Sequence, residues 1–238
     1  MMIGKNVTIG ENVTVPETVI IHDNVILRDN VCLHDYVVIY PEVEIREGTE
    51  VFDHSVLGKV PKGAGGNSRE INCNLGPTII GENCVISPSC VVYRGTTISN
   101  NTLLGDFCSI REDCKIGSYC IISRNVSVNY NTVIGNHVKI MDNSHITGDM
   151  KIGNYVFISV LVSTTNDNSM DRTPDAVNEL GGPIIEDGVS IGAGANILPH
   201  VVIGANSIVG AGALVSRDVP ANKVVMGIPA KVVRDVDR

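Results

Sequence analysis

A six-residue repeat runs through almost the whole chain and restricts the folds it can adopt. Counted in sixes from Ile3, from Ile80 and from Ile185, 30 units begin with Ile, Leu or Val. The fifth position is almost as strict and holds small residues such as Val, Cys, Ser and Ala, with Pro61 and Met150 as exceptions. Side chains alternate along a strand, so positions five and one point inward and position six points outward. Positions two to four are rich in Gly, Asn and Asp, which favour turns. The repeat therefore predicts short strands joined by turns and wound into a coil.

The form of the repeat, [Ile/Leu/Val]-Gly-x-x-[small]-x, resembles the bacterial hexapeptide-repeat acyltransferases. The closing stretch "GAGANILPHVVIGANSIVGAGALVSRDVPANKVVMGIPAKVVRDV" is similar to the last coils of the acyl-CoA-dependent members. This resemblance implies an all-β fold, a left-handed parallel β-helix in which three hexapeptides form one triangular coil. Residues 1–220 would then form a single domain of about ten coils. The resemblance also implies a homotrimer with active sites in the grooves between subunits.

Three segments leave the repeat. Residues 63–79 and 164–184 are rich in Gly, Asn and Pro, so we expect two loops that leave a corner of the coil. Long loops in compact domains are often functional, although plain bulges are the alternative. Residues 221–238 are expected to cap the exposed edge of the last coil, with a short helix as one option.

Composition excludes several classes of function. The net charge of -8 argues against a general nucleic-acid binder. No apolar run approaches the ~18 residues of a membrane span. The start "MMIGKNVTIG" has no secretion signal, so we expect a cytoplasmic protein. The seven cysteines include no C-x-x-C pair, and five are spaced by multiples of six, which indicates small core residues.

One outer face of the predicted coil carries a candidate catalytic residue. Position-six residues 18 apart stack on one face, and one such series is Val91, Ser109, Ser127, His145 and Ser163. Because this series has no long charged side chains, the face could form the floor of a substrate groove. A neutral imidazole near an amine can take its proton, so His145 is the predicted base. A plain surface residue and a contact between copies remain alternatives for His145.

The stretches "LGDFCSIRED" and "VSVNYNTVIGNHVKIMDNSHITG" resemble N-acyltransferases that act on nucleotide-linked amino-deoxy sugars. The resemblance implies direct attack of the amine on the thioester of acetyl-CoA or another acyl-CoA, with no permanently bound cofactor. The candidate substrate residues are Asp106, Ser109, Arg111, Glu112, Ser127, Asn129, Tyr130, Asp142 and Asn143. The candidate CoA-binding residues are Ser163, Gly194, Ala195, Gly212, Ala213, Lys231 and Arg234. Simple turn formation is the alternative role for Asp142, Asn143 and the glycines.

No metal site is expected from the histidines. The γ-type carbonic anhydrases share the implied fold but have two histidines five apart on one chain, whereas His137 and His145 are eight apart. His34 and His54 are expected to be surface polar groups. An O-acetyltransferase and a non-catalytic β-helix scaffold are the competing functions. The acyl group, the sugar, its ring position and the final proton acceptor, His145 or the CoA sulfur, stay open.

Overall fold

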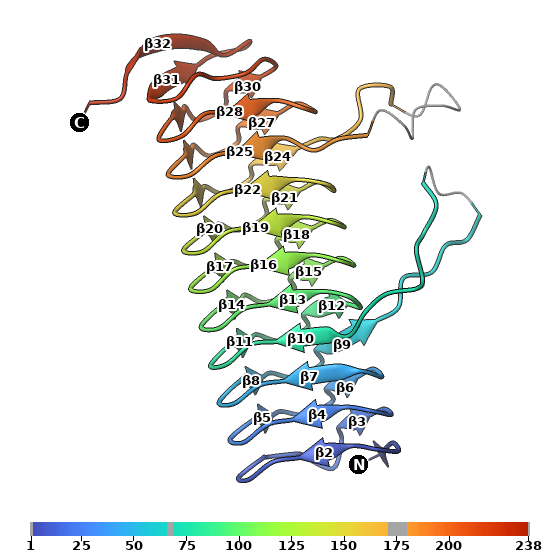
Figure 1. The fold of residues 1–238 in the computed structure, drawn as a ribbon. Helices are drawn as coiled ribbons and strands as arrows, with labels where there is room; N and C mark the ends of the chain where they lie inside the picture. Colours follow the sequence, from blue (N-terminus) through green and yellow to red (C-terminus); the bar gives the residue numbers. More distant parts are fainter. Residues whose placement is uncertain (1, 66–68, 171–179, 238) are drawn as a thin grey trace.

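The computed structural model describes residues 2–65, 69–170 and 180–237. The chain winds into a long triangular β-solenoid whose termini lie at opposite ends (Figure 1). Three parallel sheets form its sides, which we call faces A, B and C. Within the described ranges the chain forms strands and turns but no helix. The all-β fold of stacked parallel strands is therefore confirmed.

Face A contains 11 strands, in this order along the solenoid: β1 (Met2–Ile3), β3 (Ile20–Ile21), β6 (Val38–Ile39), β9 (Val56–Lys59), β12 (Val91–Tyr93), β15 (Ser109–Ile110), β18 (Ser127–Val128), β21 (His145–Ile146), β24 (Ser163–Thr164), β27 (Asn196–Ile197) and β30 (Leu214–Val215). Face B contains 10 strands: β2 (Thr8–Ile9), β4 (Ile26–Leu27), β7 (Val43–Ile45), β10 (Thr78–Ile80), β13 (Thr97–Ile98), β16 (Lys115–Ile116), β19 (Val133–Ile134), β22 (Lys151–Ile152), β25 (Ile184–Ile185) and β28 (Val202–Ile203). Face C contains 11 strands: β5 (Cys32–Leu33), β8 (Glu50–Val51), β11 (Val85–Ile86), β14 (Leu103–Leu104), β17 (Ile121–Ile122), β20 (Lys139–Ile140), β23 (Phe157–Ile158), β26 (Ser190–Ile191), β29 (Ile208–Val209), β31 (Lys223–Met226) and β32 (Lys231–Asp235).

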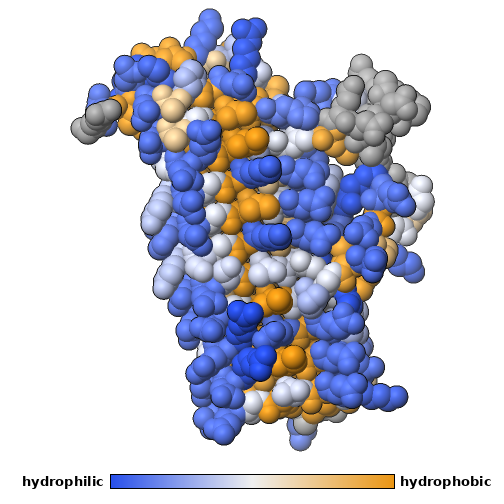
Figure 2. Space-filling view, in the orientation of Figure 1, coloured by the Kyte–Doolittle hydropathy of each residue, from blue (hydrophilic) through white to orange (hydrophobic). Residues whose placement is uncertain are grey.

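The inward positions of the repeat form one continuous core. Ile122 and Ile140, first-position residues of successive coils on face C, pair in register and are fully buried. Each buried Ile, Leu or Val contributes about 1.5–3 kcal/mol through removal of apolar surface from water. The five cysteines of the repeat are buried and free, which confirms their assignment to the core. Figure 2 shows apolar residues in a strip along the solenoid, interrupted by polar residues and bordered by polar edges.

The fourth position of most units adopts a left-handed backbone conformation. Asn143 has a φ of 61° and His137 a φ of 58°. Asparagine tolerates this conformation better than most residues, which explains its frequency in these turns. The turns thus need a specific backbone shape, while their outward side chains stay free to vary.

The predicted ten coils are too few, because face A alone holds 11 parallel strands. Thr164 occupies the buried inward position of β24. The count of repeat units included only Ile, Leu and Val at this position, so it omitted this strand. The expected cap exists, but it is built from strands instead of a helix. β31 continues face C, and β32 pairs with it in antiparallel orientation.

Both insertions leave the same corner of the solenoid. The first connects β9 on face A to β10 on face B, and the second connects β24 on face A to β25 on face B. Figure 1 shows both segments projecting from one side of the molecule. Parts of the predicted loops, residues 66–68 and 171–179, lie outside the described residues. We call this edge the A–B corner and the edge between faces C and A the C–A corner. Among the described residues, none belongs to a helix able to cross a membrane.

Candidate active site

The predicted column of small polar side chains lies on face A between the two insertions. Ser109 pairs with Ser127, Ser127 with His145, and His145 with Ser163, each in register on neighbouring parallel strands. All four side chains occupy outward positions and are half-buried. We call these residues the Ser/His column. Neighbouring strands lie about 4.8 Å apart, so the column presents polar groups at regular spacing along the face.

His145 is the one imidazole of this column. Its Nδ1 lies 2.7 Å from the Ser127 hydroxyl oxygen, and the direction of that hydrogen bond depends on the tautomer. Burial of the ring lowers the pKa of His145 below its ordinary value of 6.5. The adjacent inward positions are filled by Ser144 and Ile146, which are buried, so the ring cannot turn into the core. The arrangement provides a neutral imidazole, held by a hydroxyl, on the outer wall of the solenoid.

A charged cluster lies at the A–B corner beside the column. Glu112 is only 2% exposed and forms ion pairs with Arg69 of the first insertion and with its neighbour Arg111. The Arg111 Nε donates to Glu112 Oε2 at 2.8 Å. Burial alone would raise the pKa of Glu112, but hydrogen bonds from Arg111 and Arg69 outweigh it and lower the pKa. Two guanidinium groups face the Glu112 carboxylate here, and Asp113 in the same turn adds a second carboxylate, so the cluster offers guanidinium N–H donors without a net positive charge.

Tyr130 connects the two insertions. The Arg69 guanidinium stacks over the Tyr130 ring, 3.5 Å from its centroid. The Asn166 amide of the second insertion donates to the Tyr130 hydroxyl at 3.1 Å. The ring also lies against Gly148, where an added Cβ would come within 2.6 Å of the ring carbons. Asn129, the residue before Tyr130, is half-buried at the same corner.

The remaining substrate candidates lie across the column at the C–A corner. The carboxylate of Asp142 accepts a hydrogen bond from Ser123 and one of 2.6 Å from Arg124. The hydrogen bond from Ser123, which has the larger effect, and the one from Arg124 hold the pKa of Asp142 below its usual range. Asp106 adds to the negative field around Arg124. Asn143 is exposed in the turn that precedes His145. The side-chain contacts described for Asp142 thus go to the preceding coil and not to the imidazole.

Arg124 was missed by the sequence reasoning, although a signal for it exists. It lies 18 residues before Asp142, so it occupies the same column of the C–A corner. Asn166 was also missed, because it lies in an insertion where no repeat fixes its position.

The candidate CoA residues fall into three groups. Ser163 continues the Ser/His column, and Ala195 and Ala213 are fully buried in the core. Gly194 and Gly212 lie in left-handed turns, where an added Cβ would meet no atom within 4 Å. The backbone N–H groups of these glycines and alanines already donate to backbone carbonyls. The space beside the glycines is therefore open, but their backbone N–H groups are already hydrogen-bonded within the solenoid.

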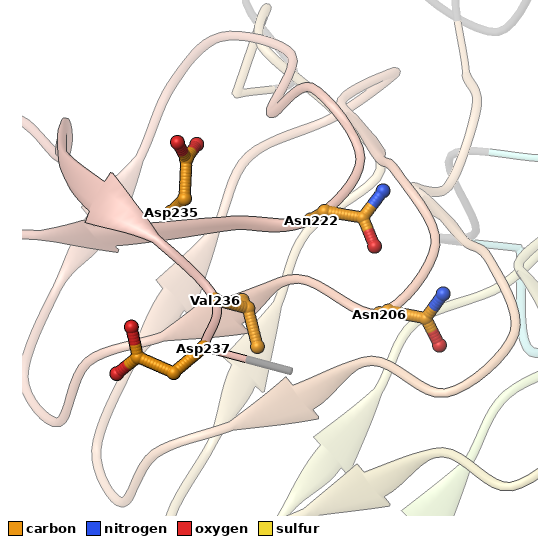
Figure 3. A pocket seen from close by; sticks show the side chains of 5 residues that line it. All are labelled: Asn206, Asn222, Asp235, Val236 and Asp237. Carbon is orange, nitrogen blue, oxygen red and sulfur yellow. The ribbon is translucent and has the colours of Figure 1, made fainter.

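Lys231 and Arg234 lie on the exposed strand β32 of the cap. A hollow of about 630 Å³ opens beside this strand (Figure 3), lined by Asn206, Asn222, Asp235, Val236 and Asp237. Arg234 already pairs with Asp237 at 2.9 Å. The other lining carboxylate, Asp235, pairs with Lys223, so the Arg234 and Lys223 cations are already neutralised and the hollow is a poor site for the phosphates of CoA.

Two family models match the repeats. Residues 95–129 and 182–217 match the model described as bacterial transferase hexapeptide (six repeats). Residues 1–34 and 77–105 match the hexapeptide repeat of succinyl-transferase.

Solved structures and curated proteins resemble the chain to different extents. LpxA from Acinetobacter baumannii superposes with a TM-score of 0.62 at 24% identity, over 94% of this chain and 74% of that one. An Arabidopsis UDP-N-acetylglucosamine acyltransferase superposes at 0.61 with 17% identity, over 93% and 74%. At these identities the likeness shows the fold alone. A 2,3,4,5-tetrahydropyridine-2,6-dicarboxylate N-acetyltransferase of Clostridium perfringens is 57% identical over 54 residues, 23% of each chain. The chain spans less than a third of the length of the curated relatives it matches.

Proposed function

Because the chain belongs to the hexapeptide-repeat family of bacterial transferases, we propose that it is an acyl-CoA-dependent N-acyltransferase. The observation that carries the proposal is the half-buried imidazole of His145, hydrogen-bonded to Ser127 on the face between the two insertions. A base of this kind typically accelerates a reaction by about 10²–10⁴-fold.

The reaction is a direct transfer between two bound substrates. The acceptor ammonium gives a proton to His145 Nε2, which requires the Nδ1 proton to point toward the Ser127 oxygen. The free amine then attacks the thioester carbonyl and forms a tetrahedral oxyanion. Collapse of this intermediate forms the amide, breaks the carbon–sulfur bond and releases the CoA thiolate. The second amine proton leaves to the thiolate or to solvent. Ser127 serves to fix the imidazole.

The acceptor that we propose is a nucleotide-linked amino-deoxy sugar. The guanidinium groups of Arg69 and Arg111 at the A–B corner can donate paired hydrogen bonds to the pyrophosphate of such a molecule. The Asp142 and Asp106 carboxylates at the C–A corner can accept hydrogen bonds from sugar hydroxyls. Because the Ser/His column lies between the two corners, the amine would lie over His145.

The test is a thiol-release assay with acetyl-CoA and a panel of acceptors, followed by mass spectrometry of the products. The panel contains nucleotide-linked amino sugars, amine-bearing dicarboxylic acids and hydroxyl acceptors. An N-acetylated nucleotide sugar is the expected product. Turnover of a dicarboxylic amine alone would overturn the acceptor but keep the acyl transfer. Hydroxyl products would favour the O-acetyltransferase, and failure to bind CoA in calorimetry would favour the scaffold.

Variants at two histidines test the base. His145→Ala is expected to lower kcat by about 10²–10⁴-fold. His137→Asn is the matched control, because His137 lies in a turn of another corner between the rings of Tyr119 and Tyr155. Asparagine tolerates the left-handed backbone there. Full activity in His145→Ala would remove the base from the mechanism and leave the CoA sulfur as the proton acceptor.

We also propose that three copies associate along their solenoids. The outward positions of face C include the apolar residues Ile121 and Phe157, which are 36% and 40% exposed, with Lys139 between them. Exposed apolar residues that share one face favour contact with another copy over contact with water. Sedimentation velocity would give the mass of a trimer, and a monomer at micromolar concentration would contradict this proposal.

A further inference from the structure

Three potential metal ligands lie together near the N-terminal end of face C, on a different side of the solenoid from His145. Cys32 is on β5, His34 follows that strand, and Glu50 is on the adjacent strand β8. The pairing register places Cys32 directly beside Glu50. Because side chains alternate along a strand, Cys32 and His34 both point outward while Leu33 is buried. The repeat therefore brings a thiol, an imidazole and a carboxylate to one spot.

The ligand atoms are close enough to share one ion. The Cys32 Sγ lies 3.9 Å from His34 Nε2, and His34 Nε2 lies 2.8 Å from Glu50 Oε1. All three ligand atoms lie within 4.8 Å of one another. Tetrahedral zinc with bonds of about 2.0–2.3 Å places its ligand atoms roughly 3.3–3.8 Å apart. Small side-chain rotations would therefore open the His34–Glu50 contact enough for an ion to enter.

The imidazole is held in position by a ring beneath it. His34 stacks on Phe52, with ring centroids 4.4 Å apart and planes 11° from parallel. The side chains of His34 and Glu50 are 34% and 41% exposed, so the site is open to solvent ions. Ordered but accessible ligands lose little conformational entropy when an ion binds.

We propose that Cys32, His34 and Glu50 bind a divalent transition-metal ion, with zinc the best match to this set of ligands. A thiolate excludes magnesium and calcium, which prefer oxygen ligands, and favours softer ions. Three protein ligands leave a fourth position for water or another donor. A search of the sequence for pairs of histidines could not find this site, since it consists of one histidine, one cysteine and one glutamate.

The experiment uses the full chain, freed of metal by dialysis against a chelator. Cobalt(II) is added as a spectroscopic substitute, because a cobalt–thiolate bond gives a charge-transfer absorption band. Zinc affinity is then measured by competition with a chromophoric chelator, and zinc content by elemental analysis. The expected result is one ion per chain with the thiolate band. Cys32→Ser should abolish the band and weaken zinc binding at least about tenfold, and Glu50→Gln should weaken it with the band retained.

Two matched variants serve as controls. Cys73→Ser removes another accessible thiol, and His22→Gln removes another histidine stacked on a ring, that of Tyr40. Both should bind cobalt as the unmodified chain does. Equal zinc affinity in Cys32→Ser and the unmodified chain would overturn the proposal and leave only the His34–Glu50 hydrogen bond. A thiolate band that disappears in Cys73→Ser would also overturn it. Acyl transfer is not measured, so this result is independent of the proposed function.

Discussion

At the residue scale, the environment of His145 determines the pH at which it can accept a proton. Burial disfavours the charged imidazolium and lowers the pKa of His145. As the pH is lowered, we expect kcat/KM for acyl transfer to fall only below the ordinary histidine pKa of about 6.5. The reason is that the imidazole of His145 stays neutral to lower pH than an ordinary histidine. A pH–rate profile of the unmodified enzyme measures this fall on the acidic side. An NMR titration of the His145 ring shows whether His145 is the group responsible. A titration of the ring above pH 6.5 would contradict the prediction.

The hydroxyl of Ser127 has a separate role that can be tested. Ser127→Ala removes the partner of Nδ1, so the ring loses its fixed orientation while its own chemistry is retained. We expect kcat to fall by about tenfold with little change in KM, as for other groups that position a ligand or base. The control is Ser190→Ala, which changes the same repeat position on face C. A rise in KM with unchanged kcat would instead place Ser127 in substrate binding.

At the scale of single elements, the turns and strands could be predicted from the sequence but the insertions could not. The six-residue period places Ser127 beside His145 because every coil contributes the same number of residues. Arg69 meets Glu112 across 43 residues, and no repeat fixes the path of the chain between them. The Ser/His column was therefore predictable, whereas the contacts of Arg69 and Asn166 with Tyr130 required the structure. The partner of Asp142 was also predictable from the six-residue period, since Arg124 lies inside the repeat.

The two contacts of Tyr130 lead to a prediction about the first insertion. Tyr130→Phe keeps the ring beneath Arg69 and removes only the bond to Asn166, whereas Tyr130→Ala removes both. A cation–π contact is worth about 0.5–2 kcal/mol, so trypsin cleavage after Arg69 should be about 2- to 30-fold faster in Tyr130→Ala. Tyr130→Phe should be cleaved at the rate of the unmodified chain.

Mass spectrometry of timed digests gives the cleavage rate at Arg69 directly. Tyr119→Asn serves as the control, because Tyr119 stacks on His137 at a different corner. Equal cleavage rates at Arg69 in Tyr130→Ala and the unmodified chain would show that the ion pair with Glu112 holds the insertion without help from the ring.

At the scale of the whole molecule, the repeat predicted the solenoid but undercounted its turns. Thr164 replaces an aliphatic residue at an inward position, so the count of aliphatic units missed its coil. Its hydroxyl donates to the His145 carbonyl at 3.0 Å and also lies 3.2 Å from the Met150 sulfur. A buried hydroxyl with partners costs little, so the core accepts a polar residue there. The strand pairing of the cap could not be predicted from the sequence either, because residues after 220 no longer follow the period of six.

The continuous core also determines which of the seven cysteines can react. Burial raises the pKa of the Cys84 and Cys120 thiols, and raises that of Cys114 to about 12. For Cys108 the hydrogen bond with Cys90 raises the pKa further. Because the thiolate is the reactive form, buried thiols with raised pKa values should be inert in the native protein.

We therefore expect a chromogenic disulfide reagent at neutral pH to label only Cys73, which is exposed, and Cys32, which is half-buried. The other five should react only after unfolding, since the stacked coils would have to separate to expose them. Cys73→Ser should leave one rapidly reacting thiol, and zinc should protect it if Cys32 is a metal ligand. Rapid labelling of more than two thiols in the native protein would mean that the coils open locally, in conflict with a single packed core along the whole solenoid.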